Sequence, residues 1–284
     1  MSALEPTRVS YLGPEGTFTH LAALFAFGKD AQLEPVASIQ AVFQAVAQGN
    51  TPRGVAPIEN STEGSVGVAL DGLLENDLQI EAEIVLQIEQ CLLAQHSELH
   101  AIQSVVSHPQ GLGQCRGWLH SNLPNAELLV AQSTSAAAQE AKRDATVAAV
   151  ASSLSAELYN LQIVARNIQD VGENITRFVV LSHKKPARTG NDKTSLAFTA
   201  PHERGALRRV LGVFDDASIN LTRIESRPAK QQKLWEYVFF VDLEGHVEDA
   251  NVKQALTRLQ QMCGMSKVLG SYPRASSLLS RSGT

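Results

Sequence analysis

The sequence predicts an α/β protein with a two-lobed region followed by a smaller C-terminal domain. Over residues 9–150, short apolar runs that suit strands alternate with stripes that suit helices. That order is typical of parallel-type sheets covered by helices on both faces. After residue 193 the order becomes strand, helix, strand, strand, helix, strand, which indicates a ferredoxin-like βαββαβ domain. A chain of 284 residues also exceeds one small core and suits two or three compact units.

The composition is that of an ordinary globular protein and excludes several function classes. Apolar residues make up 44% of the chain and charged residues 19%. The net charge of −5 gives no overall positive field for nucleic acid or an anionic membrane. The first ten residues hold no apolar segment of a secretory signal, and no apolar run approaches the roughly 20 residues of a membrane helix. We therefore expect a cytoplasmic protein.

The cysteines and the polar clusters give no sign of a bound metal or cofactor. Cys91, Cys115 and Cys263 match no zinc or redox spacing, and we expect them to be reduced thiols. No cluster of His, Cys and Asp has the spacing of metal ligands. The glycines at residues 13–16 are too few and too close for a nucleotide-binding fingerprint. We expect neither a metal nor another cofactor.

The first lobe begins with a strand at Val9–Leu12 that stops at the turn-forming cluster Gly13–Gly16. Thr17 or Thr19 then caps a helix whose apolar face carries Leu21, Leu24 and Phe25. The other elements expected in this lobe are a helix from Ser38 to Gly49, a strand at Gly54–Ile58, a helix carrying Leu70, Leu73 and Leu74, and a strand at Leu78–Leu86.

The second lobe repeats the alternation of strands and helices. Its expected strands are Ser104–Ser107, Leu128–Val130 and Thr146–Val150. One helix starts at Pro109 with Leu112, Cys115 and Leu119 on one side, and Ser133 or Thr134 caps an alanine-rich helix. We expect the first lobe to comprise residues 7–82 and 161–182, and the second lobe residues 83–160.

A polar segment at residues 183–192 contains Lys, Pro and Gly without an apolar stripe and is interpreted as a linker. The C-terminal domain is expected at residues 193–273, with a tail at 274–284. Its expected elements are strands at Ser195–Thr199, Ile219–Ile224, Leu234–Val241 and Ser266–Leu269, helices at Gly205–Phe214 and Val252–Leu259, and a hairpin around Pro228–Lys230.

Three polar clusters lie where predicted strands end: Gly13–Thr19, Glu59–Ser65 and Ser107–Gln114. In sheets of this kind, ligands bind beyond the C-terminal ends of the strands. The sequence therefore predicts a ligand cleft between the two lobes.

These clusters resemble, in order, the motifs of the prephenate dehydratase family. The matching segments are Gly13–Thr19 (with Thr19 where Ser is more usual), Pro57–Ser61 with Glu63-Gly64, Ser107–Gln110 with Gln114-Cys115, Ser133–Ala137 and Asn174–Phe178. The last third resembles an ACT regulatory domain, with Gly205–Leu207 and Glu225–Pro228 as its phenylalanine-site motifs. One such motif would be weak, whereas seven in order make a strong signal. No segment resembles a helical chorismate mutase, so the resemblance is to the stand-alone enzyme.

The resemblance implies a type II periplasmic-binding-protein-like catalytic region, of two lobes, that converts prephenate to phenylpyruvate with loss of carbon dioxide and water. Hydroxide is a poor leaving group, so a donor must supply a proton or a strong hydrogen bond to it. Two alternatives stay open: an arogenate dehydratase, which performs the same elimination on the amino-acid analogue, and a non-catalytic amino-acid-binding sensor.

Thr176 is the first choice for contact with the leaving hydroxyl, as a hydrogen-bond donor or a proton relay. Glu59 is a neighbour that holds a proton if its pKa is raised, or else a carboxylate at a helix N-terminus. Asn60 and Gln114 are neutral donors that orient the substrate. The further candidates for substrate binding, which alternatively are helix caps or an ion-pair partner, are Thr17, Ser61, Ser107, Ser133, Thr134, Arg177 and Phe178.

The resemblance also implies feedback control by L-phenylalanine, bound between two copies of the ACT domain. Gly205, Ala206 and Leu207 would contact the amino acid from one subunit, and Glu225 and Ser226 from the other, with Asn220 and Leu221 nearby. Such a site requires a symmetric oligomer, a homodimer or homotetramer. The alternative is that these are turn and edge-strand residues of a domain that only dimerises.

Overall fold

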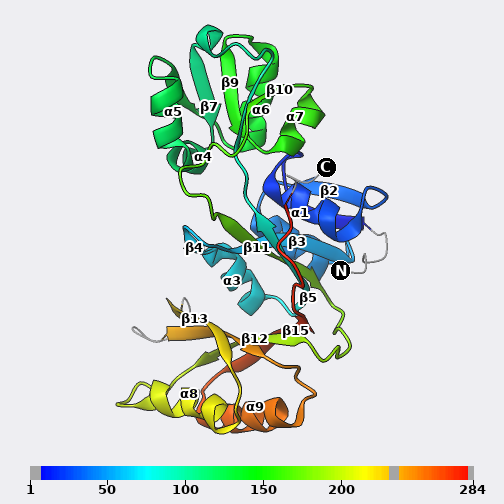
Figure 1. Ribbon diagram of the computed structural model, residues 1–284. Helices are drawn as coiled ribbons and strands as arrows, with labels where there is room; N and C mark the ends of the chain where they lie inside the picture. The colour runs from blue at the N-terminus through cyan, green and yellow to red at the C-terminus, as the bar shows by residue number, and fades with distance from the viewer. Residues whose placement is uncertain (1–7, 230–236, 281–284) are drawn as a thin grey trace.

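The computed structural model describes residues 8–229 and 237–280, arranged in three tiers (Figure 1). The second lobe lies at one end, the first lobe in the middle, and the C-terminal domain at the other end. The predicted two-lobed α/β region with a βαββαβ domain is confirmed. No helix in these two ranges is long and apolar enough to cross a membrane.

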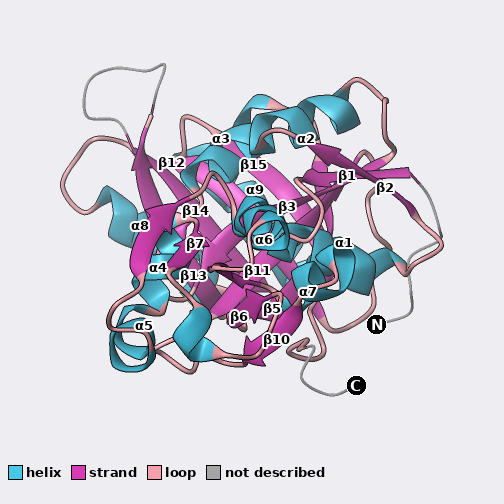
Figure 2. Cartoon of the chain, turned by 90° about the horizontal axis from the view of Figure 1, so that it is seen from above, coloured by secondary structure: helices cyan, strands magenta, loops and turns pink. Residues whose placement is uncertain are grey.

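The first lobe is built on a mixed sheet with strand order β2-β1-β3-β11-β5. Its strands are β1 (Arg8–Leu12), β2 (Gln32–Val36), β3 (Arg53–Asn60), β5 (Gln79–Gln87) and β11 (Ile175–Ser182), and the short β4 (Gly64–Ser65) pairs with β3. One face carries α1 (Phe18–Phe27), and the other carries α2 (Ile39–Ala47) and α3 (Gly67–Glu75) (Figure 2).

The helix starts in this lobe follow from side-chain caps. Thr17 accepts a hydrogen bond from the His20 N–H at the start of α1, and Ser38 does the same for Ala41 in α2. Thr19 is therefore not the cap. Phe25 was expected on the apolar face of α1 but is 37% exposed, because the buried stripe runs through Leu21, Ala22 and Ala26 instead.

The second lobe has a mixed sheet with strand order β10-β6-β9-β7-β8. The strands are β6 (Cys91–Ala94), β7 (Ser104–Ser107), β8 (Glu127–Val130), β9 (Val147–Ala151) and β10 (Gln162–Ala165). The helices are α4 (Pro109–Gln114), α5 (Arg116–Asn122), α6 (Thr134–Arg143) and α7 (Ser153–Tyr159), with a 3₁₀ turn at Leu99–Ala101.

The single helix expected from Pro109 is wrong, because the chain breaks at Cys115 (φ −114°, ψ 12°) into α4 and α5. The Asp170 carboxylate accepts hydrogen bonds from the first-turn N–H groups of Gly117 and Trp118, at 2.8 and 2.9 Å. Since an acidic side chain at this position stabilises a new helix start, α5 begins where Asp170 reaches it.

Two expectations about the lobes need correction. The sheets are mixed rather than parallel, because β11 runs antiparallel to β3 and β5, and β6 runs antiparallel to β9 and β10. The boundaries at 83 and 161 are also wrong: β5 stays in the first sheet to Gln87, whereas β10 belongs to the second. The chain crosses between the lobes at residues 88–90 and again at 166–174.

The C-terminal domain has the strand order β13-β14-β12-β15. Its elements are β12 (Asp192–Thr199), α8 (Ala206–Asp216), β13 (Leu221–Pro228), β14 (Tyr237–Glu244), α9 (Ala250–Met262) and β15 (Ser266–Pro273). The hairpin expected around Pro228–Lys230 reaches beyond the described residues, as does the first part of the strand expected at Leu234–Val241. β12 starts at Asp192, inside the expected linker.

The sheet of the C-terminal domain is covered on both faces. Leu196 and Phe198 face the domain's own helices, whereas Ala197 and Phe240 share a hydrophobic cluster with the first lobe. The backbones approach closely at Gly270, where a Cβ would lie only 2.5 Å from the Ile80 carbonyl oxygen. The domain is therefore packed against the first lobe as part of one core.

Residues 274–280, which belong to the segment expected as a tail, run along β5. The Leu279 N–H donates to the Val85 carbonyl, and its own carbonyl accepts from Gln87, at 2.9 and 2.8 Å. Its side chain packs against the cluster that contains Ile84 and Leu86. This stretch therefore fixes the C-terminal end of the described chain to the first lobe.

A buried charge cluster joins the C-terminal domain to the first lobe. The Arg177 guanidinium donates to Asp242 (2.5 Å) and to the Tyr272 hydroxyl (2.7 Å), and its Nε lies 2.9 Å from Glu83 as an ion pair. Glu83 also pairs with Lys193 at 2.7 Å. Burial is the largest influence on Asp242 and raises its pKa. The Arg177 and Arg223 charges, together with hydrogen bonds from Ser195 and Arg177, outweigh burial and lower the pKa.

Asp242→Ala should lower the free energy of unfolding by about 3–5 kcal/mol, because it leaves the Arg177 charge buried without its closest partner. Asp216→Ala, which removes an exposed pair with Arg258 in the same domain, is the matched control and should cost less than about 1 kcal/mol. Denaturant unfolding of both variants measures the difference. Equal losses would show that the buried cluster does not stabilise the interface.

Candidate active site

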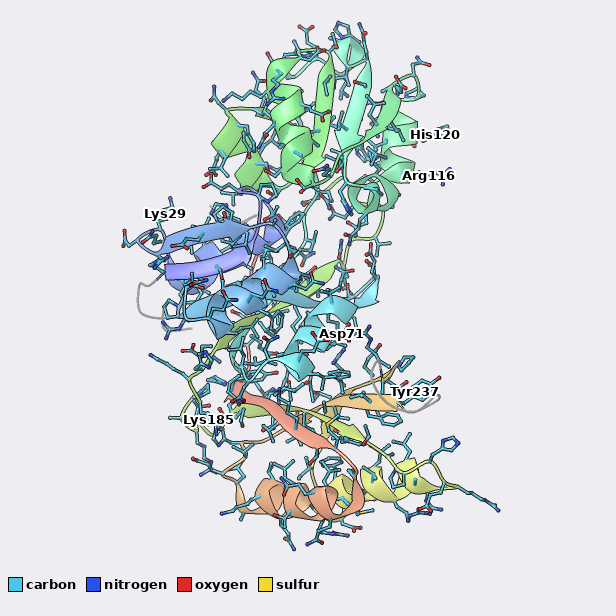
Figure 3. All side chains as sticks on the ribbon, turned by 180° about the vertical axis from the view of Figure 1, so that it is seen from behind. Lys29, Asp71, Arg116, His120, Lys185 and Tyr237 are labelled. Atoms are coloured by element: carbon cyan, nitrogen blue, oxygen red, sulfur yellow. The ribbon has the colours of Figure 1, made fainter. Side chains whose placement is uncertain are left out.

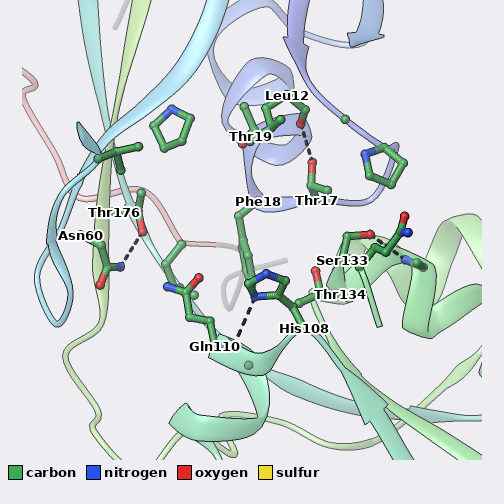
Figure 4. Close-up of a pocket in the computed structure, with 18 of the residues that line it drawn as sticks. Leu12, Thr17, Phe18, Thr19, Asn60, His108, Gln110, Ser133, Thr134 and Thr176 are labelled. Atoms are coloured by element: carbon green, nitrogen blue, oxygen red, sulfur yellow. Dashed lines mark hydrogen bonds between the residues drawn. The ribbon is translucent and has the colours of Figure 1, made fainter. Parts of the chain in front are cut away.

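A cleft of about 1260 Å³ opens between the two lobes. Its walls are the loop after β1 (residues 13–17, hereafter the glycine loop), the ends of β3 and β11, and the first turns of α4 and α6. Figure 4 shows Thr176 and Asn60 on one side and Thr17, Ser133 and Thr134 on the other. The predicted location between the lobes is therefore where the structure has a cavity.

Thr176 and Asn60 lie directly opposite each other on the paired strands β11 and β3. The Asn60 Oδ1 accepts hydrogen bonds from the N–H groups of Thr62 and Glu63, at 3.0 and 3.1 Å, which fixes the orientation of the amide. The Asn60 Nδ2 consequently donates to the Thr176 hydroxyl oxygen at 2.8 Å. Because this oxygen accepts from Asn60, the hydroxyl hydrogen of Thr176 is left to be donated to a ligand.

Glu59 and Arg177, the chain neighbours of this pair, do not line the cleft. Successive residues of a strand point to opposite faces, so both side chains face the C-terminal domain. The Glu59 carboxylate lies 3.6 Å from Arg177 and 3.2 Å from Arg223 of β13. The structure therefore places neither Glu59 nor Arg177 in the cleft, and it shows the ion-pair alternative for Arg177.

Gln114 and Phe178 line the cleft as expected. The Oε1 of Gln114 accepts from the Gln90 Nε2 at 3.1 Å, which leaves the Gln114 Nε2 to donate to a ligand. The hydroxyl of Thr17, in contrast, is already used twice: it donates to the Leu12 carbonyl and accepts from the His20 N–H. Thr17 therefore acts as a helix cap, and its side of the cleft offers chiefly backbone groups.

Ser133 and Thr134 line the cleft at the start of α6, where Ser133 caps the helix by accepting from the Ala136 N–H. Ser61 and Ser107 do not reach it. Ser61 accepts from the Ile175 N–H and ties two loops together, and Ser107 donates to the Val150 carbonyl at 2.6 Å in the core of the second lobe. The motif positions of Ser61 and Ser107 thus serve the fold.

The cleft offers neutral hydrogen-bond donors rather than cations: none of the described residues that line it is Lys or Arg. It contains the carboxylates Glu15 and Glu63, the ring of His108, and the N-terminal ends of α1 and α6. The sequence reasoning missed a set of polar side chains here, namely Gln90, Gln110, Gln132, Gln139 and Tyr159. Of these, Gln110 carried a usable signal, since it lies within the matching segment Ser107–Gln110.

The fold and the cleft together define a two-lobed α/β protein with a ligand cleft between its lobes and a ferredoxin-like C-terminal domain. A model described as "Prephenate dehydratase" matches residues 9–186, and one described as "ACT domain" matches residues 194–261. The chain therefore belongs to the prephenate dehydratase family, whose members are carbon–oxygen lyases. The resemblance inferred from the sequence motifs is confirmed.

Curated relatives agree with this assignment. The chain is 46% identical to the bifunctional chorismate mutase/prephenate dehydratase of Aquifex aeolicus, over 97% of this chain and 76% of that protein. It is 36% identical to the prephenate dehydratase of Amycolatopsis methanolica, over 95% of this chain and 89% of the relative. Because relatives of both organisations match, the stand-alone form stays a prediction.

Two solved structures have the same fold. The prephenate dehydratase of Arthrobacter aurescens in complex with L-Phe is 36% identical, with a TM-score of 0.87 over 94% of this chain and 90% of that one. GqqA, described as a quorum quenching acylase, is 29% identical, with a TM-score of 0.86 over 95% and 98%. Because two proteins with this fold are described as different kinds of enzyme, the reaction must be argued from the residues of the cleft.

No group of three or more His, Cys, Asp or Glu that could hold a metal ion is found in residues 8–229 and 237–280. His20 instead has a structural task under the glycine loop. Its Nδ1 accepts a hydrogen bond from the Gly16 N–H at 3.0 Å, and its ring stacks on Tyr11 with centroids 4.8 Å apart. Burial lowers the pKa of His20 despite the nearby Glu15, so the neutral ring is favoured.

The free energy of unfolding should decrease as the pH falls below about 6.5, the pKa of an unperturbed histidine. Between that value and the lower pKa of folded His20, the unfolded chain binds more protons, so acid favours unfolding. Denaturant unfolding from pH 8 to 5 tests this. His20→Gln should flatten the dependence, whereas substitution of the exposed His100 by Gln should not; the opposite result would place the titration elsewhere.

Proposed function

We propose that the protein catalyses the decarboxylative dehydration of prephenate to phenylpyruvate. The observation that carries the proposal is the Thr176 hydroxyl, whose oxygen accepts from Asn60 so that its hydrogen is available in a cleft lined by neutral donors. Membership in the prephenate dehydratase family supports the reaction class. The catalytic unit is assigned to residues 8–182 and the regulatory domain to residues 192–273, and we expect the enzyme to act in the cytoplasm.

In the proposed reaction, the bond from the ring to its carboxylate breaks and releases carbon dioxide. The electron pair moves through the ring and expels hydroxide from the opposite carbon. The departing hydroxide takes up a proton supplied by the solvent and leaves as water. Thr176 donates its hydrogen bond to this departing oxygen. The bond that Thr176 accepts from Asn60 polarises its hydroxyl and strengthens this donation.

The absence of Lys and Arg from the described cleft residues suits a decarboxylation. A cation beside the ring carboxylate would stabilise the substrate more than the transition state, in which that charge is being lost. Neutral donors such as Gln114, Ser133 and Thr134 hold and orient the substrate instead. The starts of α1 and α6 provide N–H groups for the side-chain carboxylate that is retained.

Arogenate is the second candidate substrate, and the carboxylates of Glu15 and Glu63 favour it. Arogenate carries an ammonium group where prephenate has a keto oxygen, and either carboxylate would attract that group. Incubation with each substrate separately, followed by detection of phenylpyruvate or phenylalanine, distinguishes the two activities. Formation of neither product would refute the enzyme proposal and leave a non-catalytic sensor.

Thr176→Val should lower kcat by at least about a hundredfold, because it keeps the shape but removes the donor to the leaving oxygen. Thr176→Ser, which restores a hydroxyl, should recover most of the activity. Thr194→Val is the matched control, since Thr194 is a buried threonine of the C-terminal domain that donates to the Gly245 carbonyl. Steady-state assays with prephenate measure all three, and wild-type turnover by Thr176→Val would remove Thr176 from the mechanism.

We further propose that L-phenylalanine binds at the ACT domain of a homodimer or homotetramer and inhibits the enzyme, which the Arthrobacter complex with L-Phe supports. Gly205 caps α8 in the left-handed conformation (φ 76°), and Ala206 and Leu207 open the helix. On the opposite side of the proposed site, Asn220 precedes β13, which begins at Leu221 and carries Glu225 and Ser226. β13 is the edge strand of the sheet.

The alternation of β13 connects this site to the cleft. Thr222, Ile224 and Ser226 are exposed, whereas Arg223 and Arg227 point to the first lobe. Arg223 pairs with Glu59 and donates to Ser65, and Arg227 pairs with Asp71 of α3 at 3.0 Å. Figure 3 shows Asp71 on α3, above the C-terminal domain. Because Glu59 precedes Asn60, a shift of β13 on binding phenylalanine is passed to the Asn60–Thr176 pair.

Ser226→Ala should raise the phenylalanine concentration for half-maximal inhibition about tenfold, by removing one hydrogen bond to the ligand. Activity without phenylalanine should be unchanged, because Ser226 lies on the exposed face of β13. Thr257→Ala, on the exposed side of α9 in the same domain, is the control, and phenylalanine should inhibit this variant as it inhibits the wild type. Wild-type inhibition of Ser226→Ala would contradict the proposed site.

A further inference from the structure

Three buried serine hydroxyls of the second lobe hold two consecutive carbonyl groups of the glycine loop in the first lobe. Ser152 and Ser155 of the α7 region both donate to the Gly16 carbonyl, at 2.7 and 3.0 Å. Ser135 of α6 donates to the Glu15 carbonyl. All three serines are at most 1% exposed, and none lines the cleft.

The environment of these serines fixes their hydroxyls for this contact. Ser135 also meets the Tyr159 hydroxyl at 2.9 Å, and Tyr159 in turn accepts from the Gln139 amide at 3.0 Å. Ser152 caps α7 by accepting from the Ser155 N–H. The Gly16 N–H is bound on the other side by His20, within the first lobe. The peptide at Gly16 is therefore held from both lobes at once.

Gly16 is needed for this contact. Its φ of 87° is one that side chains rarely allow, and a Cβ there would lie 2.7 Å from the Ser155 hydroxyl and 3.1 Å from that of Ser135. A larger residue would therefore push the two lobes apart. The same approach cannot be explained by packing within one lobe, because every donor comes from the second lobe and both acceptors from the first.

The position of the contact matters for the cleft. The chain itself connects the lobes at residues 88–90 and 166–174, and the contact of α6 and α7 with the glycine loop is a further connection, close to α1 (Figure 1). It attaches the loop that precedes α1 to the first turn of α6, and both of these elements line the cleft. Thr176 lies on the other side of the pocket (Figure 4).

We propose that Ser135, Ser152 and Ser155 are positioning residues for the reaction. Acting through the Glu15–Gly16 carbonyls, they hold the lobes at the spacing that lets the α6 donors and Thr176 contact one substrate molecule. The proposal rests on the proposed function for its kinetic readout. Without the serine contacts, open forms of the cleft compete with the closed form, and the substrate must supply the free energy of closure.

The test is the double variant Ser152→Ala/Ser155→Ala, with prephenate as the probe. KM should rise about tenfold, the loss expected for two neutral hydrogen bonds, while kcat at saturation changes by less than about twofold. Gly16→Ala should shift KM in the same direction. The matched control is Ser10→Ala/Thr51→Val, which removes two buried hydroxyls that bond to each other and to Arg53 within the first lobe.

The two kinetic constants separate positioning from mere stabilisation. A variant that is only partly folded has a lower kcat with an unchanged KM, and that result, like an unchanged KM in a fully folded variant, would overturn the proposal. If the wild-type protein does not turn over prephenate, the proposed function fails, and amide hydrogen exchange decides the structural claim. Exchange in residues 13–20 should then quicken in Ser152→Ala/Ser155→Ala but not in the control; equal exchange refutes it.

Discussion

The burial of the Arg177 guanidinium is the interaction on which the arrangement of the domains depends. A charge removed from water at a domain interface is tolerated only when opposite charges and hydrogen-bond acceptors surround it. Arg177, Lys193 and Arg223 face Glu59, Glu83 and Asp242, so three positive charges meet three negative ones. These residues come from both the first lobe and the C-terminal domain. On each of the two surfaces alone, the positive and negative charges of the cluster do not balance. The packed arrangement of the first lobe and the C-terminal domain is therefore the stable one.

The same cluster explains why two residues of the recognised motifs, expected in the cleft, lie outside it. Motifs name consecutive residues, whereas a strand sends consecutive side chains to opposite faces. Asn60 and Thr176 belong to the cleft, and Glu59 and Arg177 belong to the interface, although each pair is adjacent in the chain. The strand identity of residues 175–182 could have been combined with this alternation. The residues that the outer face contacts could not have been predicted, because Asp242 is 65 residues away from Arg177 in sequence.

Local sequence signals predicted much of the fold, whereas the pairing of strands that are distant in sequence could not be predicted. Thr17 and Ser38 cap helices as their sequence context indicates, and the βαββαβ order of the last domain was readable from the changing period. The antiparallel insertion of β11 between β3 and β5 could not be predicted. Periodicity indicates which side chains are buried but not the direction of a neighbouring strand. The lobe boundaries failed for that reason. Ser107 illustrates the same limit for the site, because its hydroxyl is satisfied by Val150 from another strand.

The two faces of β3 and β11 also suit the proposed decarboxylation. A guanidinium inside the cleft would hold a substrate carboxylate by several kcal/mol even at a moderate effective dielectric, and that attraction would be lost as carbon dioxide forms. Placing Arg177 on the outer face removes this penalty and leaves Asn60 and Thr176 as neutral groups on the inner face. The charges then serve a second purpose, since they sit between the cleft and β13. Under the proposed function, an adjustment of the ACT domain would reach the Asn60–Thr176 pair through the peptide bond between Glu59 and Asn60, without introducing a charge into the cleft.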